Sequence, residues 1–410
     1  MEYSIKRFAG IKNTVYPERL NDGFEFDNPG FQREVAPADL IEAVNVDFDD
    51  TGYVVSRDGT ELKVSGEFYS LWSDGKIALV VQNKTLKSLS SSMVLSNLAG
   101  VAGNNLCYLS LNDRVYWSDG VSSTGVVEGG SNRSWGLPIP EIQVISRISG
   151  TLFAGRYQLA IAYERVDGQE SGTAMPVLMS SAGGDGFRVQ WSVSSVPSDV
   201  IGVILYASDA NGEQLFRVGV AQASIGYMDF KTSLLKSNAL KTRYLEKPPA
   251  CSDITYFNGR IYMAVGQNIV ATIPFGYELV DMLDFISVDG SEITMLRAVE
   301  DGIFVGTQRG ITFLKGKDLR DFESTLVRES PVLKGSAVYA DGMKVTGRKE
   351  LVGLNIVLFT TVDSIMAGLP NGELFNFTYD QYRFSGGGQA AAAFIDTNVK
   401  HQYLVVQQNI

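Results

Sequence analysis

The sequence predicts an all-β protein, a β-propeller of about six to seven blades interrupted by a β-sandwich of immunoglobulin or fibronectin type III shape. One reason is a spacing of about 43 residues between Gly259 and Gly302, which suits one propeller blade. A second is the glycine count, 42 in 410 residues, expected where many tight turns join short strands. The third is a strand–turn–strand phrase that recurs from Tyr256, Ala298 and Asp363, and more faintly from Leu71 and Gly100.

The turns in these phrases carry their own prediction. Each copy joins two apolar or β-branched runs across a polar step, and three copies contain Asn258-Gly259, Asp301-Gly302 or Asp74-Gly75. Such dipeptides supply the positive φ angles of tight hairpin turns. Helix is expected to be scarce, with a turn or two over 279–285 and 233–240.

Taken in order, the chain divides into four parts. Residues 1–45 have few apolar alternations and three prolines, which favours an extended arm. Residues 46–140 form the first part of the propeller, opening with a hairpin that turns at 49–52. Residues 141–244 form the inserted sandwich, where turns at Asp167-Gly168 and Asn211-Gly212 separate strands at the spacing of a seven-stranded domain. Residues 245–410 complete the propeller, and the run 402–406 closes the ring beside an N-terminal strand.

Composition narrows the possible partners. A net charge of −11 argues against a surface that grips nucleic acid, which needs clustered Lys and Arg. The charge permits a wall past which DNA slides without sticking, because like charges repel. No apolar stretch is long enough to span a bilayer or to serve as a secretion signal, so synthesis and assembly in the cytoplasm are expected. Cys107 and Cys251 are expected to be buried thiols rather than a disulfide.

Residues able to do chemistry are few. The chain has one histidine, His401, and no nucleophile, metalloprotease or phosphate-loop motif accompanies it. Neither a cofactor nor an enzymatic activity is therefore expected. Carboxylate pairs for glycoside hydrolysis remain open, because nothing in the sequence selects a pair. The four tryptophans could stack on sugars, although scattered tryptophans in β proteins more often belong to the core.

One segment has the spacing of a calcium loop. Asp47, Asp49, Thr51 and Asp58 match positions 1, 3, 5 and 12 of such a loop, with Gly52 at the bend. Oxygen ligands at alternate positions are what Ca²⁺ prefers. An acidic β-turn explains the same residues without a metal, and the terminal Glu and flanking helices of an EF-hand are missing.

The N-terminal phrases "GIKNTVYPERL" and "EAVNVDFDDTGYVVSRDGTELK" resemble the opening of bacteriophage tail proteins. The phrases "GTLFAGRYQLAIAYERVDGQES" and "VILYASDANGEQLFRVG" are similar to a sandwich insertion in that family. "FNGRIYMAVGQNIVATIPFGYELVD" and "VEDGIFVGTQRGITFLKG" look like its later blades. The likeness departs from the family where an arginine run usually follows the hairpin, since only Arg57 stands there.

The resemblance implies a structural virion protein, the tail nozzle (tail hub, or packaged-DNA stabilisation protein) of a short-tailed phage. It implies a homo-hexameric ring below a tail adaptor protein, a channel through which DNA exits, and docking of tail fibres or spikes. The alternative is a receptor-binding or fibre-anchoring module that binds host-surface glycans. Interfaces enrich arginine and aromatic residues. The arm residues expected to anchor a neighbouring subunit are Arg7, Phe8, Tyr16, Arg19, Phe24, Phe26 and Phe31; equally, they could tie the arm to its own propeller.

Overall fold

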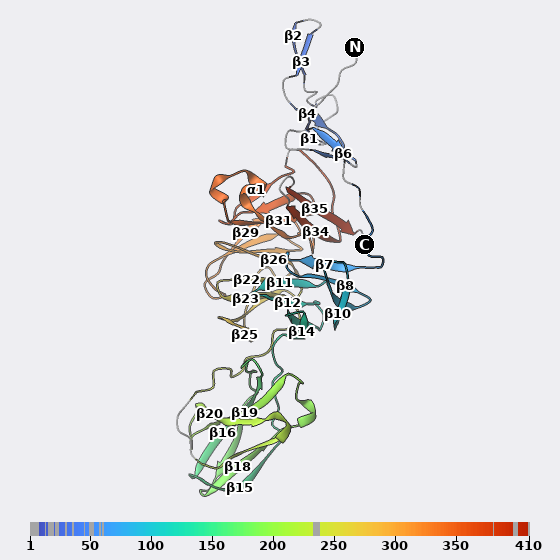
Figure 1. Cartoon of the computed structure of the whole chain (residues 1–410). Coiled ribbons are helices and arrows are strands. Elements are labelled where there is room, and N and C mark those ends of the chain that lie inside the picture. Colours follow the sequence, from blue (N-terminus) through green and yellow to red (C-terminus); the bar gives the residue numbers. More distant parts are fainter. Residues whose placement is uncertain are drawn as a thin grey trace.

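The computed structural model describes residues 8–12, 14, 20, 24–28, 31–34, 37–44, 46–48, 53–56, 59, 61–232, 238–379, 381–396 and 401–408. The structure is all-β, with 54% of the described residues in strands and 4% in helix. Figure 1 shows the short N-terminal strands at one end of the molecule, a body of several sheets in the middle and a two-sheet unit at the other end. In the described part of the chain, no helix has the length and apolar character needed to cross a membrane.

The N-terminal strands form three two-stranded sheets. The first is parallel and the other two are antiparallel. Asp47 of the calcium-like loop pairs with Val55 in the third sheet. The pairs are β1 (Phe8–Ile11) with β4 (Ala38–Leu40), β2 (Phe24–Asn28) with β3 (Phe31–Glu34), and β5 (Val46–Phe48) with β6 (Val54–Ser56).

The body contains five antiparallel four-stranded sheets, each built from strands consecutive in the sequence. We number them sheets 1 to 5. Sheet 1 is β7 (Tyr69–Ser73), β8 (Ala78–Gln82), β9 (Thr85–Leu89) and β10 (Leu95–Gly100); sheet 2 is β11 (Cys107–Leu111), β12 (Arg114–Ser118), β13 (Thr124–Glu128) and β14 (Ser131–Ser134). Sheet 3 is β22 (Asp253–Phe257), β23 (Arg260–Val265), β24 (Asn268–Ile273) and β25 (Gly276–Ser287); sheet 4 is β26 (Ile293–Val299), β27 (Gly302–Thr307), β28 (Ile311–Lys315) and β29 (Glu323–Arg328). Sheet 5 is β30 (Val338–Asp341), β31 (Asn355–Thr360), β32 (Ile365–Gly368) and β33 (Leu374–Asn376).

Sheet 6 differs from the others because it has two strands, β34 (Gln389–Asp396) and β35 (His401–Gln408), among the described residues. A short helix, α1 (Gly342–Thr346), and a 3₁₀ turn, η4 (Lys349–Leu351), connect β30 to β31. The Asp341 carboxylate caps α1 by accepting a hydrogen bond from the Lys344 amide.

Buried side chains join each sheet to the next. Five apolar clusters lie between successive sheets from sheet 1 to sheet 6, so each sheet packs against its neighbour in the sequence. Between sheets 1 and 2, for example, Leu79, Leu86, Val115 and Trp117 are all at most 1% exposed. Burial of such side chains is the main force that holds the sheets together, at roughly 25 cal/mol per Å² of apolar surface.

The unit between sheets 2 and 3, which we call the sandwich, has seven strands in two sheets that share one apolar core. One sheet has the order β15-β18-β21 and the other β17-β16-β19-β20. The strands are β15 (Val144–Leu152), β16 (Gly155–Arg165), β17 (Val177–Ser181), β18 (Asp185–Gln190), β19 (Val200–Ser208), β20 (Leu215–Gln222) and β21 (Tyr227–Phe230), with 3₁₀ turns η2 (Val193–Ser195) and η3 (Ala223–Ile225).

The strand order of the sandwich differs from that of an immunoglobulin constant domain. There the first, second, fifth and fourth strands form one sheet. Here the first, fourth and seventh strands share a sheet, and the second lies beside the third and fifth. The spacing of turns in a sequence counts strands, but it carries no information on which sheet each strand joins.

Two local expectations are corrected. The segment 279–285, expected to be helical, lies within strand β25, where Leu279 is buried and Val280 packs in the apolar cluster between sheets 2 and 3. Asn258 and Gly259 have the positive φ angles that were predicted, at 44° and 78°. Gly302 instead begins strand β27, and a side chain there would lie 2.1 Å from the Leu314 carbonyl oxygen. Close packing, rather than turn geometry, explains that glycine.

Candidate functional site

The described residues contain no cluster of three or more His, Cys, Asp and Glu side chains able to hold a metal ion. The features that stand out are instead structural: a buried charge network where the sandwich meets the body, polar loops that tie the sheets together, and an open apolar face on sheet 6. We treat these features as the candidate site, because each either joins separate parts of the fold or leaves apolar side chains exposed.

Glu278 of β25 is the centre of the charge network. Its Oε2 accepts a hydrogen bond of 2.8 Å from Arg165 Nη2 of the sandwich, and its Oε1 accepts one of 2.8 Å from Arg133 Nη2 of β14. The Gly136 amide also donates to Oε2, at 3.3 Å. One carboxylate therefore bridges sheet 2, sheet 3 and the sandwich.

The centre of the charge network is shielded from solvent. The side chains of Arg165 and Glu278 are 2% and 5% exposed. Burial by itself lowers the pKa of Arg165, but the carboxylates of Asp167 and Glu278 outweigh it and hold that pKa above its ordinary value. Asp167, which receives two hydrogen bonds from Arg165, has a lowered pKa because that pairing outweighs its burial. A buried pair of this kind resists being pulled apart, since separation leaves an unpaired charge without water.

Backbone contacts reinforce the same junction. Glu246 and Val280 exchange two backbone hydrogen bonds of 2.9 and 2.8 Å, which pair the chain leaving the sandwich with β25. Gly172 lies so close to the returning chain that a Cβ there would be 1.6 Å from the Leu245 carbonyl oxygen. The sandwich is therefore held to the body by backbone as well as charge, rather than by a loose linker.

Aspartates in the loops tie neighbouring sheets together. Asp119, between β12 and β13, accepts hydrogen bonds from the backbone amides of Val121, Ser122 and Ser123 at 2.8–2.9 Å, and from Ala102 at 2.9 Å. Its burial raises the pKa, but these four amides outweigh it and the pKa is well below the ordinary value. Asp363 is held similarly by three hydroxyls, and its pKa is lowered to about 2.

These aspartates predict a loss of stability in acid. Their pKa values are depressed in the folded chain, so the stabilisation is complete above the unfolded value of 3.8 and is lost as the pH falls through the folded values. We expect the free energy of unfolding to fall steeply between about pH 4 and pH 2. Urea titrations at several pH values measure this. The variant Asp119→Asn is expected to be less stable at pH 7 and to show a shallower decline below pH 4; an unchanged slope would contradict the assignment.

The first strands of sheets 3, 4 and 5 share a polar network. Arg297 Nη1 lies 2.5 Å from both carboxylate oxygens of Asp253, whose Oδ2 also accepts from the Leu296 amide at 2.8 Å. Beside them, Thr255 Oγ1 and the Tyr339 hydroxyl are 2.9 Å apart. Each polar group finds its partner within the network, which suits a structural role across three sheets better than catalysis.

Sheet 6 has one covered face and one open face. Phe394 and Tyr403 are paired across the sheet and pack on sheet 5, where the Tyr403 hydroxyl donates to the Ser336 carbonyl at 2.7 Å. The opposite face, which we call the open face, has an exposed apolar centre; Ile395, Leu404 and Val406 are 37%, 40% and 61% exposed. The apolar centre comprises Ala391, Ala393, Ile395, Leu404 and Val406, and glutamines lie at both ends of the same face, with Gln402 opposite Ile395 and Gln389 opposite Gln408.

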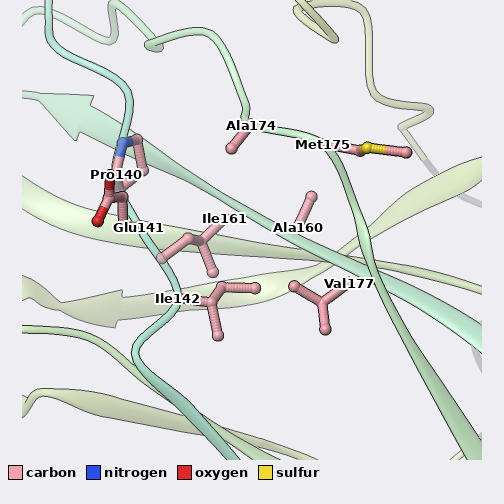
Figure 2. Close-up of a pocket in the computed structure, with 8 residues that line it drawn as sticks. All are labelled: Pro140, Glu141, Ile142, Ala160, Ile161, Ala174, Met175 and Val177. Carbon is pink, nitrogen blue, oxygen red and sulfur yellow. The ribbon is translucent and has the colours of Figure 1, made fainter.

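A small apolar cavity of about 200 Å³ lies in the sandwich. Figure 2 shows the residues that line it, among them Ile142, Ala160, Ile161 and Val177. The other lining residues are Pro140, Glu141, Ala174 and Met175. Glu141 is the one ionisable group among these eight, and none of them is aromatic. The cavity therefore offers neither an acid–base pair nor a ring on which a sugar could stack.

The residues predicted from the sequence fall in different places. Asp49, Thr51 and Asp58 lie outside the described residues, as do Arg7, Tyr16 and Arg19. Phe8, Phe24, Phe26 and Phe31 lie in β1, β2 and β3. His401 pairs through Nδ1 with Asp396 Oδ1 at 2.8 Å, at the end of sheet 6. The metal-binding role of the calcium-like loop and the anchoring role of the arm residues remain predictions.

The tryptophans belong to the interior. Trp117 and Trp135 are 1% and 0% exposed, and Trp191 is 5% exposed. Trp72 stacks on Tyr108 with ring centroids 5.4 Å apart and packs against the cluster between sheets 1 and 2. The tryptophans therefore pack in the protein core, and none of them is an exposed platform for a sugar.

Sequence reasoning missed the charge network. Arg165 and Glu278 are separated by 113 residues and Arg133 and Glu278 by 145. Each residue stands in an ordinary strand pattern, and charged residues at such positions usually face solvent. One signal was available: Arg165 and Glu278 each interrupt an apolar run.

No protein-family model and no curated protein matches this chain. Among solved structures, it is similar to a catalytically inactive virginiamycin B lyase from Staphylococcus aureus with quinupristin, at 11% identity and a TM-score of 0.32 over 82% of this chain and 91% of that one. It is also similar to the computationally designed Ika8 protein, at 12% identity and a TM-score of 0.29 over 84% and 96%. PorZ of Porphyromonas gingivalis gives 13% identity and a TM-score of 0.22 over 96% and 62%. All three TM-scores are below 0.5, so none of these likenesses carries an argument about function.

Proposed function

We propose that this chain is a structural virion protein that forms the distal nozzle ring of a short phage tail. The observation that carries the proposal is the open face of sheet 6, an uncovered apolar surface on an all-β body. Isolated apolar side chains on a surface are common, whereas a contiguous apolar sheet face generally marks an interface. The partner is a second copy of this chain, repeated around a ring that the sequence resemblance implies is hexameric.

The sheets of the body are proposed to be the blades of a six-bladed propeller, of which sheet 6 is the unfinished one. Strands β11, β22 and β26 contact one another in succession, and β30 contacts β34, as the inner strands of adjacent blades do. Asn105, just before β11, donates a hydrogen bond to Gln389 of β34, which brings sheet 6 next to the early sheets. A second copy covering the open face would remove its exposed apolar side chains from water.

Charge and rigidity also favour the nozzle. The net charge of −11 lets a channel lined by this protein repel the phosphate backbone, so DNA would exit without adhering. The buried junction at Glu278 fixes the direction in which the sandwich projects, which suits a platform for a tail adaptor protein and for fibres or spikes. The protein would be assembled in the host cytoplasm and reside in the virion.

The experiment is to measure mass by light scattering and shape by negative-stain imaging, with and without the adaptor protein of the same phage. We expect rings with an axial hole, either alone or once the adaptor is present. The variant Leu404→Asp with Val406→Asp is expected to remain monomeric, because two carboxylates would be buried at the interface. The matched control Leu283→Asp changes a residue that is 86% exposed on β25, away from the open face, and should still form rings.

Two outcomes contradict the proposal. A wild-type protein that remains monomeric and ignores the adaptor would exclude a ring. Rings formed equally well by the Leu404→Asp, Val406→Asp variant would show that the open face is not the interface. Circular dichroism spectra and unfolding midpoints close to wild type would show that the variant has folded, so that its failure to assemble reports on the interface.

A further inference from the structure

The two cysteines of the chain lie together in the interior. Cys107 begins β11, and Cys251 lies two residues before β22. Both are free and buried, as the sequence predicted, and their Sγ atoms are 4.0 Å apart. The Cys107 Sγ also lies 3.5 Å from the Cys251 carbonyl oxygen, and the Ser118 hydroxyl oxygen accepts a hydrogen bond from the Cys251 amide at 2.9 Å. Separate contacts therefore hold the two thiols opposite each other.

The position of this thiol pair in the chain is unusual. Strands β11 and β22, each the first strand and one edge of its sheet, are in contact between sheets 2 and 3. Between Cys107 and Cys251 in the sequence lie the rest of sheet 2, both connections to the sandwich and the whole sandwich. A covalent bond between these two residues would therefore close one loop that contains the entire inserted unit.

We propose that Cys107 and Cys251 are an oxidative cross-link site, at which a low-molecular-weight disulfide such as oxidised glutathione converts the two thiols into a Cys107–Cys251 disulfide. The two sulfur atoms must approach from 4.0 Å to about 2.05 Å, a shift of roughly 1 Å for each side chain. The hydrogen-bond contacts of Cys107 and Cys251 already place both side chains in one enclosed site. No other segment of the chain has to move in to supply the second thiol.

The reaction balances as two thiol–disulfide exchanges. The thiolate of one cysteine attacks a sulfur of oxidised glutathione, forms a mixed disulfide and releases one glutathione thiolate. The second cysteine, after losing its proton, then attacks the protein sulfur of the mixed disulfide and releases the second glutathione. Two protein thiols are oxidised, one disulfide of the reagent is reduced, and the two protons pass to the released thiolates.

Burial slows the oxidation of the two thiols but does not prevent it. The pKa of the Cys107 thiol is raised well above its ordinary value by the neighbouring Cys251 thiol and by burial, so few molecules carry the reactive thiolate. The reagent also has to reach an enclosed site, which requires a local opening between sheets 2 and 3. Cross-linking should therefore proceed over hours in the folded protein and faster in mild urea, where such openings are more frequent.

The test is to incubate the full chain with oxidised glutathione in mild urea, remove the urea and record the intact mass and a non-reducing peptide map. We expect a product lighter than the reduced protein by two hydrogen atoms, with a peptide pair joined at Cys107 and Cys251. Because the closed loop is long, the melting temperature of this product is expected to rise by about 4 °C. The rise should disappear when a reducing agent is added.

The matched control is Cys251→Ser, which keeps a side chain of similar size but removes the second thiol. It is expected to stop at a glutathione adduct on Cys107 and to show no rise in melting temperature. The proposal is overturned if the wild type also accumulates only glutathione adducts, or if the cross-linked product melts below the reduced protein. Because the peptide map is made on the wild-type chain, the conclusion does not depend on whether the variant folds.

Discussion

Replacing Glu278 with alanine is expected to lower the free energy of unfolding by about 3 kcal/mol, because two arginines lose a buried carboxylate partner. The estimate lies at the lower end of the range for broken buried pairs. Arg165 keeps Asp167 as a partner, and Arg133 keeps Glu128 at 3.6 Å. The loss should be nearly independent of salt concentration, since the Arg165–Glu278 pair is shielded from solvent.

A denaturant titration followed by tryptophan fluorescence measures this loss, because Trp135 packs in the same region and donates to the Tyr277 carbonyl beside Glu278. The matched control is Glu128→Ala, which removes from Arg133 a carboxylate that is 45% exposed. Exposed pairs contribute about 0–1 kcal/mol, so the control should be almost neutral. Equal effects of the two substitutions would show that the buried network adds nothing beyond a surface ion pair.

Gly172→Ala is expected to be the second severe substitution, with a loss of about 3 kcal/mol. A methyl group at this position would meet the Leu245 carbonyl oxygen at 1.6 Å, which is far inside the contact distance of the two atoms. The obstructing atom belongs to the backbone, so no side-chain rotation relieves the overlap. The chain that returns from the sandwich would have to move away from Gly172, and the nearby pairing of Glu246 with Val280 would be disturbed.

Calorimetry and small-angle X-ray scattering together check this prediction. The variant should melt at a lower temperature, and its scattering should show a changed or variable orientation of the sandwich relative to the body. The control is Gly100→Ala in β10, where a Cβ meets no atom within 4 Å, and its effect should stay within about 0.5 kcal/mol. A Gly172→Ala variant as stable as the Gly100→Ala control would contradict the close approach described here.

Local pattern predicted local structure well in this chain. The all-β class follows from alternating apolar runs, and the positive φ angles at Asn258 and Gly259 follow from the residues themselves. The prediction of a helix at 279–285 was wrong because "LVDMLDF" suits a helix by intrinsic preference, whereas packing of Val280 in the cluster between sheets 2 and 3 favours strand β25. Propensity is a weak prior, and tertiary packing overrides it.

The candidate site could not be predicted in the same way. Arg165, Glu278 and Arg133 are joined by folding over separations of more than 110 residues, and no short window contains the pair. The strands of sheet 6 are "QAAAAFID" and "HQYLVVQQ", continuous apolar runs that do not distinguish one face from the other. Whether one or both faces of that sheet are covered depends on sheet 5, which lies earlier in the chain.

The sequence by itself determined the strands, many of their turns and the acidic balance, because these depend on residues close together in the chain or on a simple sum of charges. The tertiary structure alone decided the strand order of the sandwich, the charge network at Glu278, the approach of Cys107 to Cys251 and the uncovered side of sheet 6. Each of these depends on which distant segments pack together. The free energy of that packing is a property of the whole fold rather than of any one segment.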